Sequence, residues 1–119
     1  TKDLRLECEE RTAKECVDLG LLKMSEIKKQ KPNEPAVKKF FMHGVSHPIG
    51  LDVHDVTYNH FKIEPGWVLT VEPAIYLKDE GFGVRLENTV AVTENGPLDL
   101  MADIPIEVDE IEALMNRKK

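Results

Sequence analysis

The 119-residue sequence has little of several features that would assign it to a specialised class of protein. Its two cysteines, Cys8 and Cys16, form no disulfide or metal-binding framework. No apolar run approaches the roughly 18–20 residues of a membrane span, and no signal-peptide segment follows the first residues. With 16 Lys and Arg against 22 Asp and Glu, the net charge of −6 disfavours nucleic acid and anionic membranes as partners. These absences predict a soluble, cytoplasmic protein with reduced thiols.

What is present is an ordinary globular composition, with 41% hydrophobic and 32% charged residues and a length that fits one domain. Apolar residues recur at helical spacing near both ends, and Gly and Pro divide the middle into short extended pieces. Cys8 and Cys16 are expected on a half-buried helix face. We expect an α+β fold with helices at 3–19, 25–31 and 106–115, and strands at 38–43, 67–76 and 84–93. The last strand alternates apolar and polar residues, which predicts one buried face.

All four histidines fall between positions 43 and 60, and three of them, His43, His47 and His54, lie in one stretch. Imidazole binds divalent metals and transfers protons near neutral pH, so this concentration predicts a functional site. An alternative is that His43 and His54 are partly buried structural residues and that only His47 is functional. His60 lies outside the pattern and is expected on a surface loop.

Two acidic residues lie on otherwise apolar strands, where a carboxylate is costly unless a cation or hydrogen bonds compensate it. Glu72 lies within 69–73 and Glu87 within 84–87. Arg85, two residues before Glu87, is expected on the same strand face, where it can orient that carboxylate. An exposed pair with Arg85 and a role as metal ligand explain the position of Glu87 equally well.

Together, His47, Glu72 and Glu87 offer one imidazole and two carboxylates, a set that suits divalent Mn, Fe, Co or Zn. Three ligands are enough to hold one ion. Two ions sharing a carboxylate need more oxygen ligands, and residues 1–35 offer no pair of Asp on a strand.

The stretch HGVSHPIGLDVHD at 43–55 resembles the signature of the Xaa-Pro aminopeptidase and prolidase branch of the pita-bread metallopeptidases. It is followed in the same order by PGWVLTVEP at 65–73 and GVRLEN at 83–88. Three ordered motifs argue against chance, and the resemblance extends over nearly the whole chain. It implies the C-terminal half of a pita-bread fold, an antiparallel curved sheet with flanking helices.

The resemblance implies a hydrolase with two divalent metal ions, for which Mn is expected and Co or Zn would also fit. His47, Glu72 and Glu87 would be metal ligands, with Glu87 bridging both ions. Glu72 would also serve as the base or proton carrier. The implied substrate is a peptide with proline at its second position, which loses its first residue.

Three further residues receive roles through the same resemblance. His54 would bind the substrate or stabilise the oxyanion, and His43 would line the same pocket. Arg85 would orient an acidic ligand.

The sequence departs from the family pattern in three ways. Ala74 stands where the family has glycine after V-E-P, and Asn88 stands where an acidic residue usually follows the bridging Glu. The third departure is larger, because the family supplies two Asp ligands from a strand pair upstream of its histidine motif and this sequence begins after them. We therefore expect residues 1–119 to be the C-terminal part of a catalytic domain, with weak metal binding and no peptidase activity alone.

An incomplete sheet would leave an exposed edge or apolar face. The expected partners are therefore the missing N-terminal half of the same protein and a second copy in a homo-oligomer. A prolidase-type dipeptidase and a non-enzymatic pita-bread module that binds peptides or proteins are the alternatives to an Xaa-Pro aminopeptidase.

Overall fold

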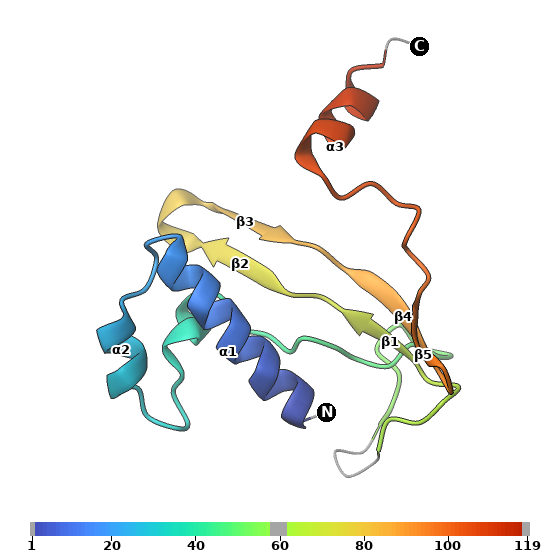
Figure 1. The fold of residues 1–119 in the computed structure, drawn as a ribbon, viewed down its shortest axis with the longest axis horizontal. Coiled ribbons are helices and arrows are strands. Elements are labelled where there is room, and N and C mark those ends of the chain that lie inside the picture. The colour runs from blue at the N-terminus through green and yellow to red at the C-terminus, as the bar shows by residue number, and fades with distance from the viewer. Residues whose placement is uncertain (1, 58–61, 118–119) are drawn as a thin grey trace.

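The computed structural model describes residues 2–57 and 62–117, and it shows an α+β arrangement in which one helix lies along a long antiparallel ribbon (Figure 1). Helix α1 is followed by a short helix α2, a 3-10 turn η1, the strands, and a last helix α3 that stands apart from the ribbon. The elements are α1 Lys2–Asp18, α2 Met24–Lys29, η1 Ala36–Lys39, β1 Val68–Val71, β2 Ala74–Leu77, η2 Lys78–Glu80, β3 Phe82–Arg85, β4 Asn88–Thr93, β5 Gly96–Asp99 and α3 Val108–Met115. Among the described residues, the helices are too short or too polar to cross a bilayer.

The ribbon is two strand pairs that follow one register. β1 pairs antiparallel with β4, where Val71 faces Asn88, and β2 pairs antiparallel with β3, where Ala74 faces Arg85. From Val71 to Ala74 the chain advances three residues, and from Asn88 to Arg85 its partner goes back three. The β2–β3 pair therefore continues the register of the β1–β4 pair. The interruption falls at Pro73, which has no N–H to donate to a neighbouring strand. β5 extends the first pair on the other edge of β4.

The predicted strands at 67–76 and 84–93 are therefore each divided in two. The predicted burial of one face of 84–93 is wrong, because all four residues of β3 are exposed and all six residues of β4 are half-buried. Alternation produces a buried face only where another layer covers it, and Val84 is 58% exposed.

The predicted strand at 38–43 is also wrong, because Ala36–Lys39 form a 3-10 turn. The N–H of Phe40 and that of Phe41 both donate to the carbonyl of Val37, at 2.9 and 2.8 Å. Val37, Phe40 and Phe41 are all buried, and their spacing of three and four is helical rather than alternating. Aromatic residues favour a strand, but the periodicity of these buried positions favours a helical turn.

The core lies between α1, η1 and the start of β2, and includes Ala13, Cys16, Phe41 and Ala74. The three helices are found close to their predicted ranges. Cys8 is half-buried and Cys16 is buried, which confirms the predicted helix face. Burial raises the pKa of the Cys16 thiol, with a contribution from the charge of Glu15, so this thiol is protonated at neutral pH.

One buried carboxylate ties α1 to η1. Glu9 is only 5% exposed in its side chain and lies 2.7 Å from the guanidinium of Arg5 and 2.8 Å from the ammonium of Lys38. Burial by itself raises the pKa of Glu9, but hydrogen bonds and charges from Lys38 and Arg5 outweigh it and hold the pKa below its ordinary value of 4.5. This ion pair fixes the start of the segment that leads to the histidines.

Replacing Glu9 by Gln is expected to lower the free energy of unfolding by about 1–2 kcal/mol at pH 7, because two charge-assisted hydrogen bonds are lost beside partly exposed cations. A carboxylate with a depressed pKa stabilises the fold above pH 4.5, and this contribution disappears as the pH falls through the folded-state pKa. Urea unfolding of both proteins at pH 7 and pH 3 measures the difference.

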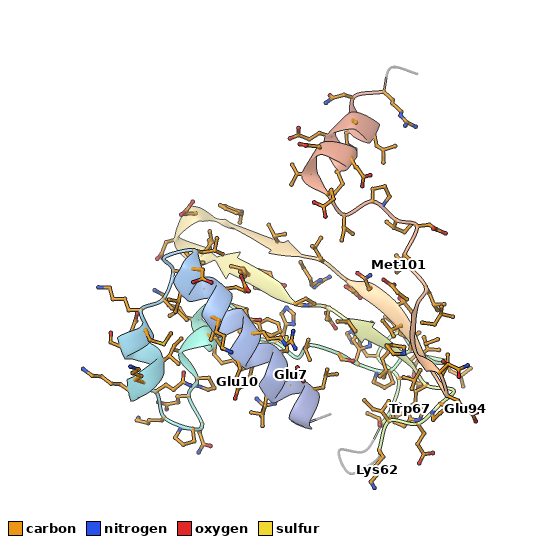
Figure 2. The ribbon with its side chains drawn as sticks, viewed as in Figure 1. Glu7, Glu10, Lys62, Trp67, Glu94 and Met101 are labelled. Carbon is orange, nitrogen blue, oxygen red and sulfur yellow. The ribbon has the colours of Figure 1, made fainter. Side chains whose placement is uncertain are left out.

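The matched control is Glu10→Gln, since Glu10 lies next in the helix with an exposed side chain (Figure 2). An unfolding difference for Glu9→Gln that is as large at pH 3 as at pH 7 would contradict the assignment.

Candidate metal centre

β1 is the central element of the candidate site, because the chain is paired to it on both sides. The segment 45–49 runs antiparallel along one edge, where the N–H of Ile49 donates to Val68, that of Thr70 to His47, and that of Glu72 to Val45, at 2.9–3.0 Å. β4 lies along the other edge.

These two pairings bring distant side chains onto one face. His47 lies opposite Thr70, and the register of the ribbon, carried one step beyond Val71 and Asn88, sets Glu72 opposite Glu87. Thr70 and Glu72 are two residues apart and therefore point to the same side of the strand. The pairing thus directs His47, Glu72 and Glu87 toward a common volume.

Each of these three side chains offers a ligand atom, and the three atoms all lie within 4.8 Å of one another. Nε2 of His47 lies 3.5 Å from Oε1 of Glu72. The side chains of His47 and Glu72 are 20% and 13% exposed, and that of Glu87 is 38% exposed. The cluster is therefore a partly covered site with one open side at Glu87.

The donor chemistry fits a divalent ion. Nδ1 of His47 lies 3.0 Å from the carbonyl of Pro48, and because a carbonyl only accepts, Nδ1 carries the proton. In the neutral imidazole this leaves a lone pair on Nε2, on the side of Glu72, which is the usual arrangement of a metal-bound histidine. Two ligands bound at about 2.0–2.2 Å to one tetrahedral ion lie about 3.4 Å apart, close to the distance between His47 and Glu72.

His54 lies beside this cluster. Its ring centroid is 4.2 Å from that of His47, in an edge-to-face arrangement, and its side chain is exposed. The loop that carries it is closed by the N–H of Asp55, which donates to Pro48, and that of Gly50, which donates to Asp52. The alternative of a partly buried His54 is therefore wrong.

Arg85 lies beside the open side of the cluster, with its Nε 3.3 Å from Oε2 of Glu87. The expected proximity of these two side chains is confirmed. Both are partly exposed, so the ion pair by itself adds little stability. Glu87 both pairs with Arg85 and converges with His47 and Glu72. An exposed ion pair and a role as metal ligand are therefore compatible explanations for its position.

His43 is held by a separate set of contacts. Its Nδ1 lies 2.6 Å from the carbonyl of Gly44 and therefore donates, which leaves Nε2 to accept from the hydroxyl of Tyr76 at 3.0 Å. Its ring also packs edge-to-face on Phe41 and Tyr76. His43 is thus a half-buried, hydrogen-bonded residue, as its structural alternative predicts. His60 lies outside the described residues.

Sequence reasoning missed two residues of this region, Thr70 and Tyr76. Thr70 contacts both His47 and Glu72 through its hydroxyl, and Tyr76 orients His43. The sequence offers only a weak signal for them. Each carries a polar group on an apolar strand, and each is an even number of residues from Glu72, a spacing that places side chains on the same face of a strand.

Comparison with known proteins matches residues 2–94 to the model of metallopeptidase family M24. The chain is 42% identical over 113 residues to the Xaa-Pro aminopeptidase of Escherichia coli, a match that covers 83% of this chain and 25% of that protein. The chain therefore spans about a quarter of the length of this curated relative.

The chain is also similar to solved structures of aminopeptidase P. A Bacillus anthracis protein assigned as an aminopeptidase P is 37% identical with a TM-score of 0.81, over 96% of this chain and 25% of that one. Zinc-substituted aminopeptidase P of Escherichia coli, in complex with product, is 35% identical with a TM-score of 0.74, over 98% of this chain and 34% of that one. These matches confirm the predicted α+β class and the predicted resemblance to the pita-bread fold of aminopeptidase P.

Replacing Gly83 by Ala tests the hydrogen bond between Tyr76 and His43. Gly83 faces Tyr76 across the β2–β3 pair, and a Cβ there would overlap the tyrosine ring and lie 3.2 Å from the carbonyl oxygen of Ile75. We expect the ring to be displaced, the His43 ring resonances to shift, and stability to fall by about 1–2 kcal/mol. Nuclear magnetic resonance and thermal unfolding measure these effects.

Gly44→Ala is the control, because a Cβ at that position meets no heavy atom closer than 4.0 Å. Unchanged His43 resonances in the Gly83 variant would contradict the described contact.

Proposed function

Since the chain belongs to metallopeptidase family M24, we propose that it is the metal-binding part of an aminopeptidase that removes an N-terminal residue preceding proline. The observation that carries the proposal is the convergence of His47, Glu72 and Glu87 ligand atoms within 4.8 Å. The substrate class in this proposal is supported by the similarity of the chain to a relative named Xaa-Pro aminopeptidase.

The complete enzyme is proposed to hold two divalent ions, with Mn expected and Co or Zn acceptable to the same donors. One imidazole and two carboxylates account for a single ion with an incomplete set of ligands. Glu87, on the open side of the cluster, is the proposed bridging ligand. Two Asp from elsewhere in the polypeptide would supply the remaining oxygens.

Bound divalent metal supplies Lewis-acid chemistry, which acidifies water and polarises a carbonyl group. The protein's own residues then divide the remaining tasks. Glu72 is proposed as the base that takes a proton and later returns it, because its carboxylate is 13% exposed and held by hydrogen bonding. Arg85 orients Glu87 from 3.3 Å.

His54 and His43 are proposed to act on the substrate. His54 is exposed and adjacent to His47, so its ring can donate to the substrate carbonyl as negative charge develops. His43 is proposed to line the same pocket, with its orientation set by Tyr76.

The proposed partner of this chain is the rest of the same polypeptide. An open groove of about 590 Å³ lies between α1 and the ribbon, and most of the surface exposed in it is apolar, although Glu7, Arg11, Thr12 and Glu15 of α1 also line it. It includes Leu4 and Cys8 of α1 together with Val84 and Leu86, at β3 and just beyond it. Exposed apolar surface of this kind is normally covered, and about three-quarters of the length of the Escherichia coli relative lies outside the match. Self-association in a homo-oligomer and a cytoplasmic location stay predictions.

In the complete enzyme, Glu87→Gln is expected to reduce metal-dependent release of the first residue of an Xaa-Pro peptide by at least about a thousandfold, because a neutral amide is a poor bridging ligand. Peptide turnover in the presence of Mn measures the loss.

Glu94→Gln is the matched control, because Glu94 lies in the turn between β4 and β5 at the end of the ribbon (Figure 2). An unchanged rate for Glu87→Gln would refute its ligand role. Release of residues only from dipeptides would favour a prolidase, and absence of turnover in the complete wild-type protein would favour a binding module.

The 119-residue chain alone is expected to bind Mn weakly, with no more than one ion per chain, and to hydrolyse no Xaa-Pro peptide. Co-expression with the remaining polypeptide should restore turnover. Calorimetry with Mn and a peptide assay measure the two effects, and tight binding of two ions by the chain alone would show that its ligand set is larger than proposed.

A further inference from the structure

Thr70 occupies the position between the two most buried members of the metal cluster. It is 1% exposed and lies on β1 opposite His47 and two residues before Glu72. Its backbone N–H donates to the carbonyl of His47 at 2.9 Å. The N–H of His47 does not return the bond to the Thr70 backbone but donates to the Thr70 hydroxyl at 3.0 Å.

The hydroxyl proton has two possible acceptors. Oε1 of Glu72 lies 3.1 Å away, and the carbonyl of His47 lies 3.4 Å away. The carboxylate is both nearer and charged, so it is the stronger acceptor. The hydroxyl therefore accepts from the His47 backbone and donates to Glu72, using the two functions that a threonine side chain offers.

The oxygen that receives this bond is the one that faces the metal position. Oε1 of Glu72 lies 3.5 Å from Nε2 of His47, so Thr70 fixes the same carboxylate oxygen that converges with the imidazole. A carboxylate at a strand surface can otherwise rotate about its last bond. The hydroxyl thus sets the backbone position of one ligand and the side-chain orientation of another.

We propose that Thr70 is a positioning residue that holds His47 and Glu72 in the geometry required to bind a divalent ion. The proposal rests on the proposed metal site and adds to it a residue that touches neither metal nor substrate. Carboxylate ligands held by such hydrogen bonds bind metal about 10- to 100-fold more tightly than those that lack them.

The test compares Thr70→Val, which keeps the shape but removes the hydroxyl, with Thr70→Ser, which keeps the hydroxyl. Thr89→Val is the matched control, because Thr89 faces Thr70 directly across the β1–β4 pair and is half-buried. The probe is Zn²⁺, titrated into the 119-residue chain and followed by nuclear magnetic resonance, which measures weak binding. A metal-free readout is the exchange rate of the His47 amide proton.

Thr70→Val is expected to weaken Zn²⁺ binding by about 10- to 100-fold and to speed exchange of the His47 amide by about tenfold. Thr70→Ser and Thr89→Val should stay within about twofold of the wild type for both quantities, a pattern that general loss of stability would not produce. Circular dichroism checks that each variant is folded.

Wild-type affinity and amide exchange in Thr70→Val would overturn the proposal, and so would an equal loss in Thr70→Ser, which would assign the effect to packing of the methyl group. If Thr70→Val does not fold, Thr70→Ala replaces it, and failure of both to fold would show a purely structural hydroxyl. Absence of Zn²⁺ binding by the wild type would overturn the metal site and this role together. Zn²⁺ binding with no turnover in the complete protein would contradict only the peptidase function.

Discussion

The candidate site depends on the pairing of one four-residue strand along both of its edges. β1 receives the segment 45–49 on one side and β4 on the other, and its alternation directs side chains from three separate parts of the chain to one face. Shifting either pairing by one residue would turn a ligand to the opposite face. The chemistry of His47, Glu72 and Glu87 is therefore a consequence of backbone register.

The same arrangement creates an electrostatic requirement. The carboxylates of Glu72 and Glu87, whose ligand atoms lie within 4.8 Å of each other, repel each other when both are ionised. Arg85 offsets part of this charge from the exposed side, and the Thr70 hydroxyl satisfies one oxygen of Glu72. A divalent cation bound between these side chains, as proposed above, would neutralise the remaining charge.

The strand pairing of the ribbon is interrupted where the site lies. The ribbon is regular on both sides of Pro73 and irregular at 72–73 and 86–87, where the carboxylates lie. There the N–H of Glu72 donates to Val45, on the same edge of β1 where the N–H of Thr70 donates to His47, so this donor is paired. Away from the site, Glu9 anchors η1 to α1 and the apolar groove beside α1 stays open.

The sequence by itself determined the types and order of the chemical groups, because motif spacing and helical periodicity are local properties of the chain. His47, Glu72, Glu87 and the helix with Cys16 were all predictable in this way. The break at Pro73 and the turn at 36–39 have local signals in the sequence, a missing N–H and a helical spacing of apolar residues. Tertiary structure alone decided which segments pair with β1, the exposure of β3 and the link through Thr70. Each of these depends on contacts between segments that are far apart in the chain, which no local pattern records.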